Sequence, residues 1–458
     1  MSRALAAGAL APVVATLVLT PIGTARAAET VDCTSTQADA PAPSASTDPS
    51  LPLELLGIEE AHAWLAARRE EPGQGVRVAV VDSGVAPRSA GPAVPVIAEK
   101  PPQISSRREV GEAHGTIVAG IVAGSPRTVE GVADTGTRGS PVGPAGSGDA
   151  EGAATRLVGI APAAEVVDVR IYDSAEGGDD GDPVQPANLV AGLQWVADNA
   201  RRLDIGVVNV SLAVGEYAPL KKVLKRLARA DVVVVAASGN RPTLETDPLY
   251  EEFGPDPDEE GTAEAKPGED AAGFVWPAAY DGVVAVSSTA DGTGAGDATA
   301  QVLQSSDIDV AVPTVGLISY GLDGGSCGVP GVATSWAAAV VSGVVAMLRS
   351  HFPGETADQV VARLIATASA SGGQRNKQTG AGVVQPLEAL TRPLRPREDG
   401  TLVAASVEDR SVERATAPPP EADLLAGARD RSVWWGLVGG GALLLALVLR
   451  PVLARRRR

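Results

Sequence analysis

Short, nearly continuous apolar runs alternate along the chain with longer segments of helical periodicity. Val76 to Val81 (VRVAVV) and Val232 to Ala237 (VVVVAA) are typical of strands buried on both faces of a parallel sheet. His114 to Gly124 predicts a helix whose small residues allow close packing, and Ala187 to Arg201 predicts an amphipathic helix. Further strands are predicted at Val166–Tyr172, Val207–Leu212, Val283–Ser287 and Ile308–Val312, and further helices at Leu220–Ala230, Ser335–Arg349 and Ala357–Ala368. This alternation predicts an α/β fold with a doubly wound, mostly parallel sheet and helices on both faces.

Four polar stretches interrupt this pattern. Residues 28–50 are rich in Ala, Pro, Ser and Thr and predict an extended tether, and residues 125–156 predict a long surface loop. Residues 241–272 are acidic and Pro-rich, which predicts an inserted loop. Calcium binding by this loop is an alternative, but it shows no spaced set of ligands, so we interpret it as a solvated loop. Residues 392–431 predict a linker.

The first residues are typical of a secretory signal peptide. Arg3 provides a short positive region, Leu10 to Leu19 an apolar run, and Ala25 to Ala27 an A-x-A cleavage site. The alternative is a first transmembrane helix, but two prolines and the shortness of the run argue against it. We therefore expect an exported protein cleaved after residue 27.

The last residues are typical of a membrane anchor. Val433 to Leu449 is uncharged and apolar, which corresponds to a helix of roughly 25 Å. Trp434 and Trp435 stand where an interfacial aromatic belt is expected, and Arg455 to Arg458 form a positive end. A buried core helix is the alternative, which the four terminal arginines disfavour. The positive-inside rule then places the tail in the cytoplasm and the rest of the mature chain outside.

Composition narrows the function classes. Hydrophobic residues make up 44% of the chain but aromatic residues only 3%, so the core must be built from Ala, Val, Leu and Ile. The formal net charge of −18 argues against a nucleic-acid partner, because phosphate binding needs clustered Lys and Arg. Cys33 and Cys327 are the two cysteines of the sequence. Export permits a disulfide between them, and two free or buried thiols remain the alternative.

Of the three histidines, His114 is the candidate general base, because it opens a predicted helix and is followed by Gly-Thr. His62 lies on a helix-like stretch without a partner motif, and His351 follows a helix, where it suits a helix C-terminus. We interpret His62 and His351 as structural.

Three further side chains complete a candidate site, although each has a plain structural explanation on its own. Asp82 ends the first buried strand, where open α/β sheets place their sites, but Asp-Ser-Gly is also an ordinary turn. Ser335 opens an Ala- and Val-rich helix and is a candidate nucleophile or a simple N-cap. Asn240 follows another buried strand and is a candidate oxyanion donor or a turn residue.

Taken together, these residues resemble the subtilisin family of serine peptidases, whose triad occurs in the order Asp, His, Ser. The matching segments are V-V-D-S-G at Val80–Gly84, H-G-T at His114–Thr116, G-I-A-P-A at Gly159–Ala163, V-N-V-S-L at Val208–Leu212, S-G-N at Ser238–Asn240 and T-S-x-A-A at Thr334–Ala338. The resemblance covers roughly residues 52–390. It implies a subtilisin-like fold, a catalytic triad of Asp82, His114 and Ser335, and no metal or other cofactor in the reaction.

The resemblance also suggests finer features of the site. Asn240 is expected to stabilise the oxyanion, and an extended substrate is expected to pair with Ser211, Leu212 and Ala213. Two positions depart from the family, which usually has Gly at Ala333 and Pro at Ala339. A Gly-to-Ala change is harmful where the backbone requires a positive φ, so Ala333 raises the question of reduced activity.

Within the subtilisins the chain resembles the mycosins, membrane-bound proteases tied to type VII secretion. The signal peptide, the Cys-bearing extension, the segment G-A-G-V-V-Q-P at Gly380–Pro386, the Pro-rich linker and the C-terminal span all contribute to this resemblance. It implies protein substrates, a membrane location with the catalytic domain outside, and a type VII secretion complex as a partner. We expect the short extension to wrap the catalytic domain, held by a Cys33–Cys327 disulfide.

The expected protein is therefore a membrane-anchored serine endopeptidase that acts on secreted proteins. A structural subunit of a secretion complex with dispensable activity is the alternative, and a broadly degradative exoenzyme is disfavoured by the anchor. The expected division is a signal peptide 1–27, an extension 28–51, a peptidase domain 52–391, a linker 392–431, a transmembrane helix 432–453 and a basic tail 454–458.

Overall fold

The computed structural model describes residues 31–102, 104–130, 153–175, 181–244, 247, 249–255, 265–292, 298–370, 374–402, 433–445 and 447. The chain divides into two compact units, Met1–Val403 and Ala404–Arg458. The expected signal peptide, the basic tail and most of the linker lie outside the described residues.

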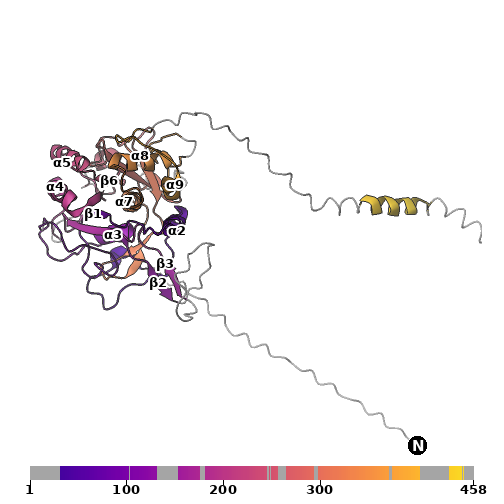
Figure 1. Ribbon diagram of the computed structural model, residues 1–458, viewed down its shortest axis with the longest axis horizontal. Helices are drawn as coiled ribbons and strands as arrows, with labels where there is room; N and C mark the ends of the chain where they lie inside the picture. Colours follow the sequence, from indigo (N-terminus) through magenta and orange to yellow (C-terminus); the bar gives the residue numbers. More distant parts are fainter. Residues whose placement is uncertain are drawn as a thin grey trace, which may run out of the picture. The chain divides into compact units, whose positions relative to one another are not determined.

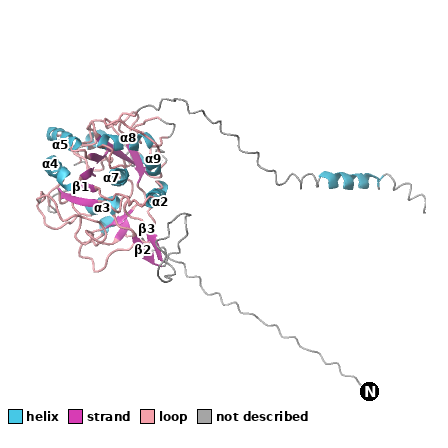
Figure 2. Ribbon diagram, in the orientation of Figure 1, coloured by secondary structure: helices cyan, strands magenta, loops and turns pink. Residues whose placement is uncertain are grey.

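Six parallel strands form the main sheet of the first unit. Figures 1 and 2 show this sheet surrounded by helices. Their order is β4-β1-β5-β6-β7-β8, and every neighbouring pair is parallel. The strands are β1 (Arg77–Asp82), β4 (Glu165–Arg170), β5 (Ile205–Val210), β6 (Val233–Ala237), β7 (Val283–Thr289) and β8 (Val310–Pro313). The prediction of a mostly parallel sheet is confirmed, because each predicted strand overlaps an observed one.

Helices cover both faces of this sheet (Figure 1). Successive side chains of β1 alternate between the faces, so Val80 joins the core under one layer of helices and Val81 joins the core under the other. The first layer contains α2 (Ile58–Ala66), α3 (His114–Ala123), α7 (Thr334–His351), α8 (Ala357–Thr367) and α9 (Pro386–Thr391), preceded by the short α1 (Leu51–Leu55), and the second contains α4 (Pro186–Leu203) and α5 (Ala218–Arg229). Two-sided coverage explains why most residues of the strands are apolar.

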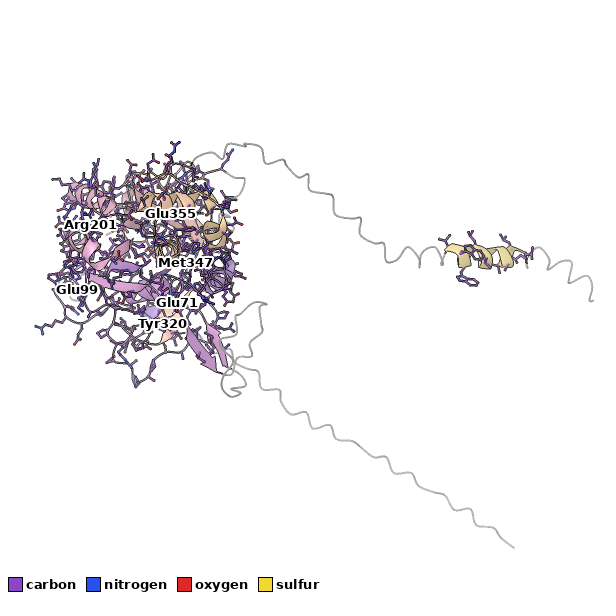
Figure 3. All side chains as sticks on the ribbon, viewed as in Figure 1. Glu71, Glu99, Arg201, Tyr320, Met347 and Glu355 are labelled. Atoms are coloured by element: carbon purple, nitrogen blue, oxygen red, sulfur yellow. A yellow bond between two sulfur atoms is a disulfide. The ribbon has the colours of Figure 1, made fainter. Side chains whose placement is uncertain are left out.

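Small side chains let α3 and α7 approach the sheet closely. A Cβ atom at Gly115, the second residue of α3, would lie 2.7 Å from the carbonyl oxygen of Gly84, just past β1. A Cβ atom at Gly343 of α7 would lie 2.5 Å from the Cβ of Ile160. Helix α7 is buried along nearly its whole length, and Met347 lies among the packed side chains of the unit (Figure 3). The contact at Gly115 holds the N-terminus of α3, where His114 stands, close to the end of β1.

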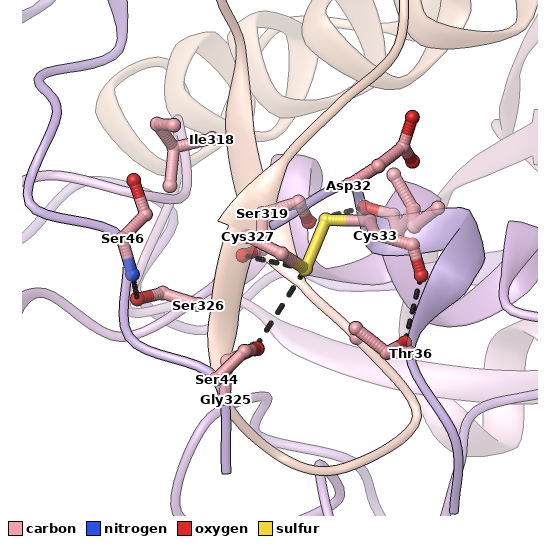
Figure 4. The surroundings of a disulfide bond; sticks show 12 residues. Asp32, Cys33, Thr36, Ser44, Ser46, Ile318, Ser319, Gly325, Ser326 and Cys327 are labelled. Atoms are coloured by element: carbon pink, nitrogen blue, oxygen red, sulfur yellow. Dashed lines mark hydrogen bonds between the residues drawn. A yellow bond between two sulfur atoms is a disulfide. The ribbon is translucent and has the colours of Figure 1, made fainter. Parts of the chain in front are cut away.

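The N-terminal extension packs on the first unit, and the Cys33–Cys327 disulfide that the resemblance to the mycosins implied is confirmed. Cys33, in the 3₁₀ helix η1 (Cys33–Ser35), is joined to Cys327 by a disulfide (Figure 4). Cys327 belongs to β10 (Ser326–Gly328), which pairs with β9 (Ile318–Tyr320) in an antiparallel hairpin. The backbone N–H of Ser46 donates to the carbonyl oxygen of Ser326 at 2.9 Å. A polar segment without periodicity is thus ordered by a covalent bond and by backbone pairing, which no local pattern encodes.

Two stretches that the sequence predicted as loops contain regular structure, so those predictions were wrong in part. Strands β2 (Arg127–Glu130) and β3 (Ala153–Arg156) form an antiparallel pair within 125–156. Helix α6 (Tyr250–Phe253) lies within 241–272. These elements are short and polar, and pairing or packing with distant residues stabilises them more than their own periodicity does.

The second unit is described at residues 433–445 and 447, where the backbone is helical. These residues belong to the expected span 432–453. Among all described residues, no helix is both long enough and apolar enough to cross a membrane.

Candidate active site

Polar side chains gather where the strand order of the sheet reverses. The chain runs from β1 outward to β4 and then returns to the opposite side of β1 as β5, so the carboxyl ends of β1 and β5 flank the switch point. Open α/β sheets bind their ligands at such a point. Asp82 is the last residue of β1, and Ser211 follows β5 directly. Asn240 follows β6, the next strand along the sheet.

Asp82 and His114 form a close hydrogen-bonded pair. Nδ1 of His114 lies 2.7 Å from Oδ1 of Asp82. The Asp82 side chain is fully buried, whereas one fifth of the His114 side chain (20%) remains exposed. The Ser83 hydroxyl accepts a hydrogen bond from the Gly115 backbone N–H at 2.9 Å, which ties the end of β1 to the start of α3. The pair is therefore fixed by the backbone on both sides.

The electrostatic balance at His114 favours the protonated ring. Burial lowers the pKa of His114, but the charge and hydrogen bond of Asp82, together with the charge of Glu112, outweigh burial and leave the pKa raised. A buried carboxylate beside an imidazole stabilises the imidazolium that forms when the ring accepts a proton. His114 thus has the surroundings of a general base.

Ser335 lies in the first turn of α7, where backbone N–H groups face outward and negative charge is favoured. Its hydroxyl donates to the carbonyl oxygen of Ser211 at 2.9 Å, and the Ser211 hydroxyl donates to the carbonyl oxygen of Ser335 at 2.8 Å. The Ser335 proton is thus directed to the end of β5 and not to His114. The next residue, Trp336, packs its ring against the His114 ring with 4.8 Å between centroids, so α3 and α7 meet at these residues.

Asn240 lies beside the start of α7 and is exposed to solvent. Its Oδ1 accepts hydrogen bonds from the backbone N–H of Thr334 at 2.8 Å and from the Thr334 hydroxyl at 3.0 Å. Because a backbone N–H only donates, the oxygen of the Asn240 amide must face Thr334. The amide NH₂ group therefore points away from Thr334 and remains the donor that Asn240 offers to a ligand.

The two departures from the family pattern cause no visible strain. Ala333 has φ −152° and ψ 142°, an extended conformation that any residue adopts, so no glycine is required there. Ala339 is fully buried within the regular helix α7.

The backbone after β5 has one edge already paired. Val214 exchanges backbone hydrogen bonds with Trp276 in both directions, at 2.8 and 3.1 Å. In an extended segment the backbone groups of neighbouring residues point to opposite sides. Those of Ala213, which is exposed, therefore face away from Trp276. Ser211 and Leu212 are both buried, and Ser211 contacts Ser335.

A groove with a volume of about 1270 Å³ opens beside His114 and Trp336. One wall is the N-terminal extension near residues 34–39, and the other is the segment 107–113 that leads into α3. The extension therefore forms one wall of the groove, and the side chain of His114 remains partly exposed.

The other histidines have structural surroundings. His62 lies 2.7 Å from the carbonyl oxygen of Ile160, and burial lowers the pKa of His62 more than that hydrogen bond raises it. His351 ends α7, at the helix terminus opposite Ser335, and pairs with Glu70. Within the described parts of the chain, no group of three His, Cys, Asp or Glu side chains is arranged to hold a metal ion.

Three residues at the site were missed by the sequence analysis. Tyr172 donates its phenolic hydrogen to Oδ1 of Asp82 at 3.0 Å. Asn209 donates to the Ser342 hydroxyl at 3.0 Å, and its Oδ1 lies 2.9 Å from the Ser211 hydroxyl, whose single proton is shared between Asn209 and the Ser335 carbonyl. Trp336 stacks near His114. The signal for Tyr172 was its position just after a strand that neighbours β1, where a side chain has access to the same sheet edge.

The chain is similar in sequence and in structure to known proteins. Residues 73–382 match the sequence model of the Subtilase family. The chain is 29% identical over 376 residues to mycosin-1 of Mycobacterium tuberculosis, covering 76% of this chain and 74% of that protein. It is 29% identical over 459 residues to mycosin-3 of the same species, covering 90% and 86%. A solved structure of the MycP3 protease from the type VII (ESX-3) secretion system is similar with a TM-score of 0.51 at 26% identity, covering 79% of this chain and 91% of that one.

Proposed function

Since this chain belongs to the subtilase family and is a subtilisin-type serine peptidase, we propose that Asp82, His114 and Ser335 are its catalytic triad. The observation that carries the proposal is the 2.7 Å pair of Asp82 and His114 at the switch point of the sheet. The N-terminus of α7 brings Ser335 to the same edge, beside the carbonyl of Ser211 that follows β5.

The reaction is acyl transfer to Ser335. Rotation about the Cα–Cβ bond of Ser335 exchanges its hydrogen bond to Ser211 for one to Nε2 of His114. His114 takes the hydroxyl proton as Oγ attacks the scissile carbonyl, and later gives that proton to the leaving amine. Asp82 holds the Nδ1–H form of the ring and offsets its positive charge. Hydrogen bonds of this kind are often incomplete without substrate and tighten when it binds.

The oxyanion is stabilised by two donors. The Asn240 amide supplies its NH₂ group, which the bonds to Thr334 turn outward. The backbone N–H of Ser335 supplies the second donor, and the first turn of α7 adds its dipole. The substrate binds extended and pairs with Ala213, whose backbone groups face away from Trp276.

We further propose a membrane-anchored protein with its catalytic domain outside the cytoplasm. A signal peptide at 1–27, a peptidase domain at 52–391 and a single span at 432–453 with a basic tail at 454–458 support this location. Similarity to mycosins and to a protease from a type VII secretion system favours a partner complex of that kind and secreted proteins as substrates.

Fluorophosphonate labelling of the purified chain tests the proposed triad. The probe is expected to react with the wild type and with Ser350→Ala, at the far end of α7, but not with Ser335→Ala. Labelling of Ser335→Ala at the wild-type rate would overturn the assignment. An unlabelled but folded wild type would favour the alternative, a structural subunit of a secretion complex.

A further inference from the structure

Tyr172 lies beside the proposed triad and has no role in the mechanism described above. It follows β4 by two residues, and β4 is the neighbour of β1 in the sheet. Its side chain is almost completely buried, with 2% exposed. The phenolic oxygen lies 3.0 Å from Oδ1 of Asp82 and 3.4 Å from Nδ1 of His114. The hydroxyl therefore contacts both members of the pair.

The hydroxyl of Tyr172 has one proton, so it can donate to only one of its two neighbours, Asp82 or His114. A carboxylate only accepts, so the phenol must donate to Asp82. Burial and the negative charge of Asp82 raise the pKa of Tyr172 well above its usual value, so the phenol retains its proton. Having donated that proton, the phenolic oxygen offers only lone pairs to His114. Nδ1 of His114 thus faces two acceptors, at 2.7 and 3.4 Å.

We propose that Tyr172 is a positioning residue that holds the Asp82 carboxylate in place and keeps the proton of neutral His114 on Nδ1. This inference rests on the proposed function only for its catalytic consequence. With the proton on Nδ1, the lone pair of Nε2 is available to accept the Ser335 proton. The other tautomer would place a lone pair on Nδ1 against two acceptors, which is unfavourable.

The charged groups around this contact are few and come from three segments. Asp82 on β1 and Glu112 before α3 both raise the pKa of His114. Burial raises the pKa of Asp168 on β4, and the nearby charge of Asp82 adds to that rise. Arg170 lies on the same strand and pairs with Asp173 at 2.6 Å. Tyr172 is thus a neutral donor in a negatively charged neighbourhood, and it adds a third hydrogen bond to Oδ1 of Asp82, beside those from His114 and from the backbone N–H of Ser83.

Tyr172→Phe removes the hydroxyl and keeps the buried ring. Asp82 then retains more of its charge for His114, so the pKa of the ring is expected to rise by about 0.5 to 1 unit. Loss of one hydrogen bond to the carboxylate is expected to reduce kcat by about 3- to 10-fold with little change in KM, because no substrate contact is removed. The matched control is Tyr320→Phe, which removes a buried hydroxyl that donates to the Ser125 carbonyl oxygen.

The decisive experiment is ¹⁵N NMR of the imidazole rings in the full-length chain, titrated with pH. The chain has three histidines, and His62→Gln and His351→Gln assign their signals. We expect neutral His114 to carry its proton on Nδ1 in the wild type and in Tyr320→Phe. Tyr172→Phe should show a raised pKa of His114, because Asp82 then keeps more of its charge for the ring. Identical titrations of wild type and Tyr172→Phe would overturn the proposal. Since this readout needs no catalysis, an inactive wild type would refute the proposed function and leave the result for Tyr172 interpretable.

Discussion

The hydroxyl of Ser335 donates a hydrogen bond to the backbone carbonyl of Ser211 at 2.9 Å, and the hydroxyl of Ser211 donates to the backbone carbonyl of Ser335 at 2.8 Å. This reciprocal pair joins the N-terminus of α7 to the end of β5. It holds the proposed nucleophile at the edge along which an extended substrate is proposed to lie. The resting contact therefore sets the position of Oγ, and in the proposed mechanism a rotation about the Cα–Cβ bond of Ser335 turns the hydroxyl toward His114.

The pH dependence of peptidase activity should follow His114. Its pKa is raised by Asp82 and Glu112 against the opposing effect of burial. The ring must be neutral to act as a base, so kcat/KM should fall as pH drops through a pKa above about 6.5. A pH series of kcat/KM measures this limb.

Asp168 is a second group that titrates near this pH, because burial raises its pKa to about 6. Replacing Asp168 therefore tests whether the acidic limb belongs to His114. Asp168→Asn should leave the acidic limb where it is. A limb that disappears in Asp168→Asn, or that lies well below 6.5, would assign the titration to another group.

Replacing Asn240 should reduce turnover through the oxyanion donor. Asn240→Ala is expected to lower kcat by about 10²–10³-fold, the size typical of removing one such donor, with a small change in KM. Asn240→Asp keeps an oxygen for the two bonds from Thr334 but removes the NH₂ group. Steady-state kinetics should show a comparable loss for both variants. Near-wild-type turnover of Asn240→Asp would show that the residue only caps α7.

The disulfide should stabilise the first unit substantially. It closes a loop with a sequence separation of 294 between Cys33 and Cys327. The chain-entropy model gives roughly 5 kcal/mol for a loop of this length, and removal of native disulfides typically costs 2–5 kcal/mol. Thermal unfolding of the double variant Cys33→Ser/Cys327→Ser should show a clearly lower Tm than the wild type. Equal melting with and without reductant would show that the backbone pairing of the extension suffices.

The sequence predicted the elements that carry their own signal. Runs such as Val232 to Ala237 are apolar throughout because the sheet is covered on both faces, and this property is visible without a structure. Strands β2 and β3 were missed because they are short and polar and form only by pairing with each other. The docking of the extension depends on a covalent bond and on backbone contacts with β10, neither of which has a local pattern.

The positions of the candidate residues in the fold were predictable from the sequence, but their contacts were not. Asp82, His114, Asn240 and Ser335 stand at strand ends and helix starts, which the pattern of elements places at one edge. The contact of Tyr172 with Asp82 requires knowing that β4 neighbours β1, and this follows from the winding of the chain. The direction of the Ser335 hydroxyl depends on the side-chain rotamer that its hydrogen bond to Ser211 stabilises. This rotamer follows from tertiary packing and has no pattern in the sequence.

The most direct test of the proposed triad is a crystal structure of the chain after reaction with a peptidyl phosphonate. We expect the phosphorus bonded to Oγ of Ser335, the bond to the Ser211 carbonyl broken, Nε2 of His114 within hydrogen-bonding distance of Oγ, and a phosphonyl oxygen on the Asn240 amide. An adduct on another residue, or a His114 ring that stays out of reach of Ser335 in the adduct, would contradict the account.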